Sequence, residues 1–202
     1  MDGLEAVLLR RGLMGEPYLD LRVEELLESV TKRGGPGAGA IAALTAASAA
    51  ALVELAARAT AVEAWPDAAG AAAQAHRLRE RLVPLARLDA EAYHAAVAQL
   101  RERGDDFALG EALARAADLP LEIADHAENV AALAADAAAH ANPELRADAA
   151  AAAALALGAA WAAAKLVEVN LAMHEDDPRL ARARQIAVGA TKTAREALTV
   201  DE

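Results

Sequence analysis

The stretch from Lys32 to Ala50, KRGGPGAGAIAALTAASAA, decides the fold, because a glycine-rich turn runs directly into an alanine-rich helix. Glycine lets another group approach the backbone closely, and the free N–H groups at a helix start suit anionic or polar ligands. The same glycines could equally turn a tight corner and let the helix pack closely. The sequence of the turn therefore leaves a ligand-binding role and a purely structural role both open.

The composition predicts an all-α protein in which residues 1–202 form a single domain. Apolar residues make up 56% of the chain but aromatic residues only 2%, so Ala, Leu and Val must fill the core. Alanine is the strongest helix former, and faces of small residues bury little apolar area. We expect a helical bundle of long, kinked, alanine-rich helices, stabilised by sharing a face with a second subunit.

The charge and the lack of cysteine exclude several classes of function. A net charge of −11 argues against binding to nucleic acid or to an anionic membrane. With no cysteine there is no thiolate catalysis and no disulfide, which favours a cytoplasmic location. The first residues lack the order of a signal peptide, and the longest uncharged run, Ala149 to Ala164, is shorter than the roughly 20 residues of a spanning helix.

The spacing of apolar residues predicts helices over 19–31, 39–60, 67–103, 107–140, 143–173 and 178–198. Pro84 is expected to kink the third of these, and Pro120 to kink or break the fourth. Asn142-Pro143 and Asp177-Pro178 each provide a cap residue followed by proline in the first helical position. No alternating strand pattern is found in the sequence.

Three short motifs could indicate nucleotide binding, metal binding or serine catalysis. Gly37 to Ala42 matches the G-x-G-x-x-A form of the dinucleotide fingerprint, but a helix precedes it where that fingerprint needs a strand. Glu91 and His94 form one E-x-x-H pair, whereas a di-metal bundle needs two, so a solvated helix face is favoured and no metal site is predicted. The two serines, Ser29 and Ser48, lack a nucleophile signature.

Four polar residues interrupt apolar helical sequence: Asp89, Asn142, Asp148 and Asn170. Burial of such groups is costly unless they are hydrogen-bonded or face a polar cavity. Together near a glycine turn they could bind a polar heterocycle. Asp148 could equally be an acid in the first turn of a helix, and Asn142 a plain helix cap.

In their order and spacing, these residues resemble the formiminotetrahydrofolate cyclodeaminase and methenyltetrahydrofolate cyclohydrolase family, which is all-helical. The family's Pro-Gly-Gly-Gly-Ser turn and following helix are similar to Pro36 through Leu44. Further similarities are carried by Thr60, Asp89 with Ala92 and Tyr93, Pro120, Ala141-Asn142, Asp148-Ala149 and Asn170-Leu171. The chain departs from the pattern at Ala38, Ala40 and Ala141, where the family has glycine, serine and glycine.

The resemblance implies acid–base chemistry on a one-carbon-substituted tetrahydrofolate, with no metal and no cofactor beyond the folate substrate. Water would open a C–N bond in a cyclohydrolase, or ammonia would leave in a cyclodeaminase. It also implies a homodimer with the site near the subunit interface. The hypothesis is that Asp148 and Asp89 are catalytic, and that the substrate is bound by Gly35, Pro36, Gly37, Gly39, Asn142, Asn170 and Lys165.

The carboxylate-bearing tail of folate needs a local basic patch, for which Lys165, Lys32 and Arg33 are candidates. The alternative from a different class is a non-catalytic or repurposed family member, acting as a helical dimeric ligand-binding or scaffold protein. The substitutions at Ala38 and Ala40 favour this alternative, whereas the four polar residues favour catalysis.

Overall fold

The computed structural model describes residues 18–32, 35–103 and 106–199. Within these ranges the chain forms helices and no strand, which confirms the all-α prediction. Gly34 and Arg33, two residues of the predicted turn and basic patch, lie outside the described residues. The helices are η1 (Tyr18–Asp20), α2 (Val23–Val30), α3 (Ala38–Arg58), α4 (Ala68–Arg103), α5 (Asp106–Ala116), α6 (Asp118–His140), η2 (Pro143–Leu145), α7 (Arg146–Asn170) and α8 (Pro178–Leu198).

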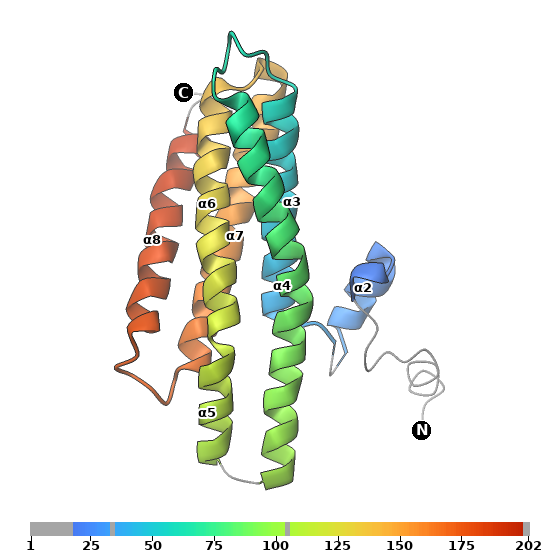
Figure 1. Ribbon diagram of the computed structural model, residues 1–202, viewed down its shortest axis with the longest axis vertical. Helices are drawn as coiled ribbons and strands as arrows, with labels where there is room; N and C mark the ends of the chain where they lie inside the picture. The colour runs from blue at the N-terminus through green and yellow to red at the C-terminus, as the bar shows by residue number, and fades with distance from the viewer. Residues whose placement is uncertain (1–17, 33–34, 104–105, 200–202) are drawn as a thin grey trace.

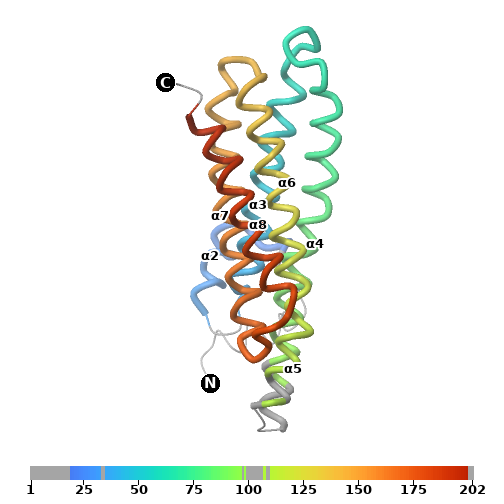
Figure 2. Tube along the Cα trace, turned by 90° about the vertical axis from the view of Figure 1, so that its left-hand side faces the viewer, coloured from blue at the N-terminus to red at the C-terminus, as the bar shows by residue number. Residues whose placement is uncertain are grey.

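The long helices run side by side as an elongated bundle, with α2 standing off to one side (Figure 1). Helix α3 packs along α4, α6 and α7, while α7 packs along α3, α6 and α8. The bundle thus has two layers, with α3 and α7 in one and α4, α6 and α8 in the other. Figure 2 shows the two layers from the side, with α2 on the same side of the molecule as α7. In the described residues, no helix of the bundle covers the outer face of the α3–α7 layer.

Proline and cap residues set most of the helix boundaries, and the start of the α-helix after Pro143 differs from the sequence-based expectation. Pro84 lies inside α4, which continues past it to Arg103. Helix α5 ends at Ala116 and α6 begins at Asp118, so Pro120 lies in the first turn of α6, where its missing N–H leaves no helical hydrogen bond unmade. Pro143 begins a short 3₁₀ turn and not the α-helix itself, which starts at Arg146.

The side chain of Asn142 does not cap a helix, contrary to one reading of the sequence. Its amide nitrogen donates instead to the carbonyl oxygen of Ala59, at 2.7 Å, across to the end of α3. Asp177 does cap α8 as predicted, accepting a hydrogen bond from the backbone N–H of Arg179 at 2.9 Å.

Alanine dominates the core of the bundle. Among the described residues, the buried hydrophobic side chains larger than alanine are Val53, Trp65, Leu82, Leu85, Ile123, Val130, Val167, Leu171 and Ile186. Alanine side chains let helix backbones approach closely but each contributes little apolar area, so stability depends on long helices buried on several faces. The core therefore has little room for any added methyl group.

The two most apolar helices are incompletely covered. By length and composition alone, α3 and the segment Pro143–Asn170 could each cross a membrane, a test that core helices of soluble bundles also pass. Of the most apolar 18-residue window in each, 61% is buried for α3 but only 44% for Pro143–Asn170. An apolar helix with more than half of its best window uncovered is typical of an interface.

The packing density of this core can be tested at two neighbouring positions on α6. Ala131 is fully buried, whereas Ala132 next to it is exposed. We expect Ala131→Leu to lower the free energy of unfolding by about 2 kcal/mol or more, because the larger side chain must push helices apart. Ala132→Leu should change it by less than about 0.5 kcal/mol. Urea unfolding followed by circular dichroism measures both, and equal effects of the two substitutions would contradict a tightly packed alanine core.

Candidate functional site

The glycine turn joins α2 to α3 and combines a structural glycine with an open one. The N–H of Gly35 donates to the carbonyl of Lys32 at 3.1 Å, and a Cβ on Gly35 would overlap the carbonyl oxygen of Ser29. Gly37 precedes the first residue of α3, and its carbonyl accepts from the N–H of Ile41 at 3.2 Å. A Cβ on Gly37 would meet no atom within 4 Å. Gly35 is therefore needed to close the turn, whereas Gly37 faces open space.

Gly39 brings α3 into contact with a carboxyl group on α4. A Cβ built on Gly39 would overlap all three carboxyl atoms of Asp89, so only glycine leaves room for that side chain. This contact joins two residues that the sequence suggested independently. It places a carboxyl group against the first turn of α3, directly after the glycine turn.

Asp89 is a carboxyl group with an altered affinity for protons. Burial in this alanine-rich environment raises its pKa from an ordinary 3.8 to about 6. Within the described part of the chain it has no hydrogen-bond or ion-pair partner to offset the loss of water. A partly desolvated carboxyl group with a pKa near neutrality, beside a helix start, is suited to exchanging a proton with a substrate.

A groove of about 440 Å³ runs along the other flank of the same turn. It will be called the glycine-turn groove, and its lining residues are Val30, Pro36, Gly37, Ala38, Ile41, Ala42, Thr45, Gly158, Ala159 and Ala162. The walls come from α2, α3 and α7 and are apolar except for Thr45. Such a groove suits the flat face of a heterocycle.

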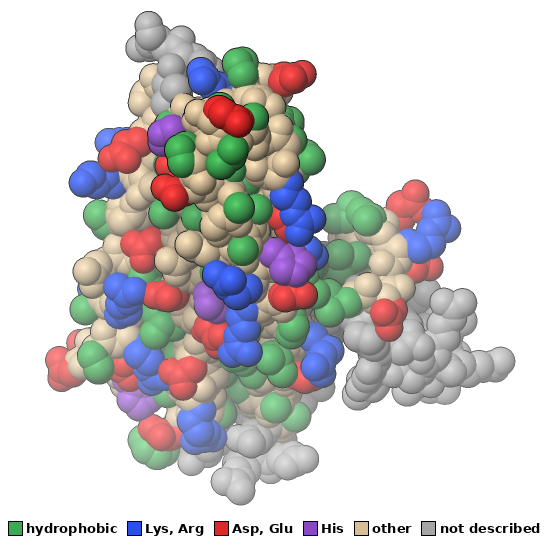
Figure 3. Space-filling model, turned by 45° about the horizontal axis from the view of Figure 1, so that its top comes forward, with side chains coloured by type: hydrophobic (Ala, Val, Ile, Leu, Met, Phe, Trp, Pro, Cys, Tyr) green, Lys and Arg blue, Asp and Glu red, His purple; other side chains and the backbone are tan. Residues whose placement is uncertain are grey.

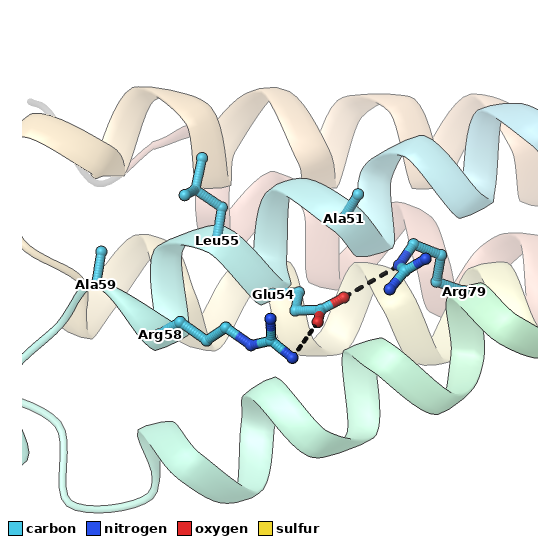
Figure 4. A pocket seen from close by; sticks show the side chains of 6 residues that line it. All are labelled: Ala51, Glu54, Leu55, Arg58, Ala59 and Arg79. Atoms are coloured by element: carbon cyan, nitrogen blue, oxygen red, sulfur yellow. Dashed lines mark hydrogen bonds and ion pairs between the residues drawn. The ribbon is translucent and has the colours of Figure 1, made fainter.

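A second groove of about 450 Å³ lies at the opposite end of α3. This arginine groove is lined by Ala51, Glu54, Leu55, Arg58, Ala59 and Arg79, as Figure 4 shows. Arg79 Nε donates to Glu54 Oε2 at 3.0 Å, and Arg58 pairs with the other carboxylate oxygen. These residues were not predicted from the sequence, although Glu54 is the one acid in α3.

Glu54 differs from Asp89 in how its burial is compensated. Its side chain is only 7% exposed, and burial by itself raises its pKa. The hydrogen bond from Arg79 and the charges of Arg58, Arg79 and His76 outweigh this effect and hold the pKa of Glu54 below its ordinary value. Two arginines around one glutamate leave a net positive charge at the rim of the groove.

The structure separates Asn142 from the glycine turn within one chain. The backbone N–H of Asn142 donates to Thr60 Oγ1 at 3.1 Å, and Thr60 in turn donates to the carbonyl of Ala56 at 2.7 Å. Asn142 is thereby tied to the C-terminal end of α3, which at 1.5 Å per residue is about 30 Å from Gly39. Asp148 is half-buried in the first turn of α7, ten residues and about 15 Å before Gly158 of the glycine-turn groove.

Lys165 and Asn170 follow the glycine-turn groove along α7. Lys165 lies one turn beyond Ala162 and donates from Nζ to Glu168 at 2.7 Å. Asn170 is half-buried at the last residue of α7, about 12 Å beyond Ala162. Of the predicted site residues, Gly35, Pro36, Gly37, Gly39 and Asp89 are brought together, with Lys165 nearby.

The single E-x-x-H pair lies on a solvated face, where Glu91 forms an ion pair with Arg87 at 2.9 Å and the ring of His94 packs against Tyr93. No group of three or more His, Asp or Glu side chains placed to hold a metal is found in residues 18–32, 35–103 and 106–199.

The described residues form an all-α bundle in which a partly desolvated carboxyl group lies against a glycine turn. These features fit a helical protein that binds a small molecule, and they do not fit a dinucleotide-binding fold, which needs a strand before the glycines. The family profile described as Formiminotransferase-cyclodeaminase matches residues 22–188, and the chain belongs to that family. The crystal structure of formiminotetrahydrofolate cyclodeaminase from Thermotoga maritima is similar in fold, with a TM-score of 0.76 and 22% identity over 89% of this chain and 96% of that one. No curated protein sequence matches the chain. Family and fold together indicate a function of the folate cyclodeaminase and cyclohydrolase type.

The raised pKa of Asp89 has a consequence for stability that can be measured. Because the folded protein holds this proton more tightly than the unfolded chain, ionisation of Asp89 opposes folding as the pH rises from about 4 through about 6. Asp89→Asn removes that cost, so it should stabilise the protein at pH 8 by at most about 3 kcal/mol and by much less at pH 4.

Urea unfolding at both pH values measures this difference. Glu91→Gln, two residues along on the exposed face of α4, is the control and should show no such gain at pH 8. A gain for Asp89→Asn that is equal at pH 4 and pH 8 would show that the carboxyl group is not desolvated.

Proposed function

We propose that the protein is a methenyltetrahydrofolate cyclohydrolase or formiminotetrahydrofolate cyclodeaminase that works by general acid–base catalysis. The observation that carries this proposal is the carboxyl group of Asp89, which has a pKa of about 6 and lies against Gly39 beside an apolar groove. Membership of the family supplies the substrate class. The reaction needs no metal and no cofactor beyond the folate, and a cytoplasmic location suits a chain without cysteine.

The pterin ring is proposed to lie in the glycine-turn groove, with its one-carbon bridge over Gly37. There the apolar walls contributed by Pro36, Ile41 and Ala159 can contact its flat face. Gly37 leaves space for this approach, since even a methyl group at that position would meet nothing. The hydrophilic tail then leaves the groove toward solvent, near Lys165.

In the hydrolase reaction, the carboxylate of Asp89 takes a proton from a water molecule while the water oxygen bonds to the methenyl carbon. One C–N bond of the resulting tetrahedral carbon then breaks, the proton passes from Asp89 to the departing nitrogen, and the hydroxyl group on the carbon releases its own proton to water as it becomes the formyl carbonyl. In the deaminase reaction, an internal amine nitrogen of the substrate adds to the carbon of the protonated formimino group, Asp89 takes the proton that this amine loses, and Asp89 then gives that proton to the nitrogen that leaves as ammonia. A pKa near neutrality suits Asp89 both to accept a proton and to donate it.

We also propose that the protein is a homodimer. The outer face of the α3–α7 layer exposes apolar side chains that the described part of the chain leaves uncovered, including Leu55, Leu155 and Trp161. A second copy burying this face would give the alanine-rich helices the apolar contact area that one bundle lacks.

The second candidate is a binding or scaffold protein with the fold but without catalysis. The observation that favours it is Ala38, which lines the groove where the family pattern has glycine. Ala40 does not weaken the enzyme proposal in the same way, because it is 1% exposed and does not line the groove. Turnover of folate distinguishes the two candidates.

Purified protein should accelerate the loss of methenyltetrahydrofolate absorbance or release ammonia from the formimino compound. The rate should rise with pH through about 6 and then level off, because the base must be ionised. Asp89→Asn should lower kcat by about 100-fold or more with little change in KM, while Glu91→Gln retains wild-type rates. No acceleration by the wild type with either substrate, together with no folate binding in calorimetry, would favour the scaffold.

A further inference from the structure

Thr45 differs from every other serine and threonine of the chain in its hydrogen bonding. The chain has eight such residues, and all of them lie within the described ranges. In seven of them the hydroxyl group donates to a backbone carbonyl three or four residues earlier; these are Ser29, Thr31, Ser48, Thr60, Thr191, Thr193 and Thr199. The hydroxyl of Thr45 makes no hydrogen bond to any described residue, although the carbonyl of Ile41 lies one turn before it. Its donor and its acceptor are therefore free for a ligand.

Thr45 also has the one polar side chain among the described residues that line the glycine-turn groove. The groove lies between α2 and the α3–α7 layer, and Figure 3 shows α2 standing beside the bundle with hydrophobic side chains on its surface. Thr45 is half-buried and follows Gly37 by eight residues, or about 12 Å along α3. The apolar groove thus has a hydrogen-bonding group at the end farther from the glycine turn.

Gly158 of α7 lies level with Thr45. The side chain of Asn142 bonds the carbonyl of Ala59, which holds the start of α7 beside the end of α3, so the two helices run in opposite directions. Gly158 is twelve residues after the first residue of α7, and Thr45 is thirteen residues before the last residue of α3. At 1.5 Å per residue, both lie about 18 to 20 Å from the joined ends. Since both line the groove, they mark the same end of it.

The packing of the bundle does not account for a glycine at position 158. Glycine inside a helix is less favourable than alanine, and α7 consists largely of alanine. A Cβ on Gly158 would meet no atom within 4 Å, so alanine would fit there without a clash. The glycine therefore keeps space open in the groove beside the free hydroxyl of Thr45.

We propose that Thr45 and Gly158 form the end of the site that receives the hydrogen-bonding edge of the pterin, the edge that carries its amino and carbonyl groups. Gly158 leaves room for this edge, and Thr45 Oγ1 donates to the carbonyl group or accepts from the amino group. A ring without polar groups on that edge would leave the hydroxyl unpaired, so Thr45 selects for a pterin. This inference rests on the proposed function for the choice of a pterin as the ligand.

This placement also sets the direction in which the ligand lies. The roughly 12 Å between Gly37 and Thr45 suits two fused six-membered rings with a hydrogen bond of about 3 Å at the far edge. Because α7 runs opposite to α3, Lys165 lies beyond Ala162 on the side away from Thr45. The polar edge at Thr45, the one-carbon bridge over Gly37 and the tail toward Lys165 then follow one another along the groove.

Removal of the hydroxyl tests the role of Thr45. Thr45→Val keeps the shape of the side chain and should raise KM for the folate about tenfold with kcat little changed, because ground state and transition state both use the bond. Thr45→Ser keeps a hydroxyl and should bind much more tightly than Thr45→Val. Ser48→Ala is the matched control on the same helix, since that hydroxyl already donates to the carbonyl of Leu44 at 2.8 Å. Equal KM values for wild type and Thr45→Val would overturn the inference.

Addition of a methyl group tests the role of Gly158. Gly158→Ala should raise the urea midpoint of unfolding, because alanine favours helix, yet raise KM about tenfold by filling the space of the ring edge. Gly70→Ala in α4 is the control, since Gly70 is also exposed with no atom within 4 Å of a Cβ, and KM should not change. An unchanged KM for Gly158→Ala would overturn the inference, and so would a lower urea midpoint, which would show that packing requires the glycine.

The mass of the variants in solution excludes an indirect effect. Thr45→Val and Gly158→Ala should keep the mass of the wild type in light scattering. A smaller mass would overturn the inference, because the two residues would then act through contact between subunits.

A reduced pterin with a methyl group in place of the folate tail distinguishes the ring edge from the tail as the partner of Thr45. Thr45→Val should weaken the binding of this compound in calorimetry about tenfold, as it does for the folate. A loss of affinity for the folate alone would overturn the assignment, since Thr45 would then contact the tail.

The proposed function and this inference fail in different ways. A wild type that binds the reduced pterin through Thr45 but turns over neither folate substrate would overturn the enzyme and retain the binding edge. Turnover that is indifferent to Thr45→Val and Gly158→Ala would retain the enzyme and overturn the binding edge. A wild type that neither binds nor turns over a pterin would overturn both.

Discussion

Contact of alanine with alanine is the constraint on which the structure depends. A buried alanine contributes less than about 1 kcal/mol of apolar transfer energy, compared with roughly 1.5 to 3 kcal/mol for a buried leucine. The bundle compensates with length, because α3, α4, α6, α7 and α8 each run for twenty residues or more. The helices also pack close together, so that their backbones as well as their side chains are removed from water. The same constraint accounts for the apolar face of α3 and α7 that the described residues leave incompletely covered.

An alanine core also affects the pKa values of the two carboxyl groups buried in it, those of Glu54 and Asp89. Alanine offers neither hydrogen bonds nor charge, so any carboxyl group among these helices must be compensated from elsewhere or hold its proton more tightly. Glu54 is compensated by Arg58 and Arg79 and stays ionised. Asp89 is not, and its pKa rises to about 6. Glu54 therefore has a structural role in holding two arginines, whereas Asp89 has no such partner among the described residues and is suited to proton transfer.

Helix positions could be predicted from the sequence because they depend on local signals. Proline, glycine and the spacing of leucines placed most of the helices to within a few residues, and Asp177-Pro178 was read correctly as the start of α8. The break before Pro120 was allowed for, but its position was not fixed, because a proline in the first turn of a helix and one that kinks it look alike in sequence. Asn142 does occupy the position before Pro143, but its side chain makes no capping hydrogen bond; its amide nitrogen donates to the carbonyl of Ala59, a tertiary partner that local rules do not include.

The site was harder to predict because it depends on the register between helices far apart in sequence. Asp89 stood out as a polar residue in an apolar helix, but its contact with Gly39, fifty residues earlier, depends on how α4 slides along α3. Arg58 and Arg79 gave no signal beyond Glu54 at a distance of four residues from Arg58, since arginines near a helix end are ordinary on a surface. The two arginines meet at Glu54 because α4 packs along α3, which the sequence does not show.

Asn142 and Asp148 lie away from the glycine turn within the chain. Both belong to the end of the bundle that holds Thr60 and Arg58, whereas Asp89 and the glycines belong to the other end of α3. A pterin ring cannot contact both ends at once, so within one chain Asp89 is the predicted polar residue that lies beside the glycine turn. Asn142 instead joins the end of α3 to the start of α7, because its amide nitrogen donates to the carbonyl of Ala59 and its backbone N–H to the hydroxyl of Thr60. The raised pKa of Asp89 follows from the opposite situation, since its carboxyl group is buried without a compensating charge among the described residues.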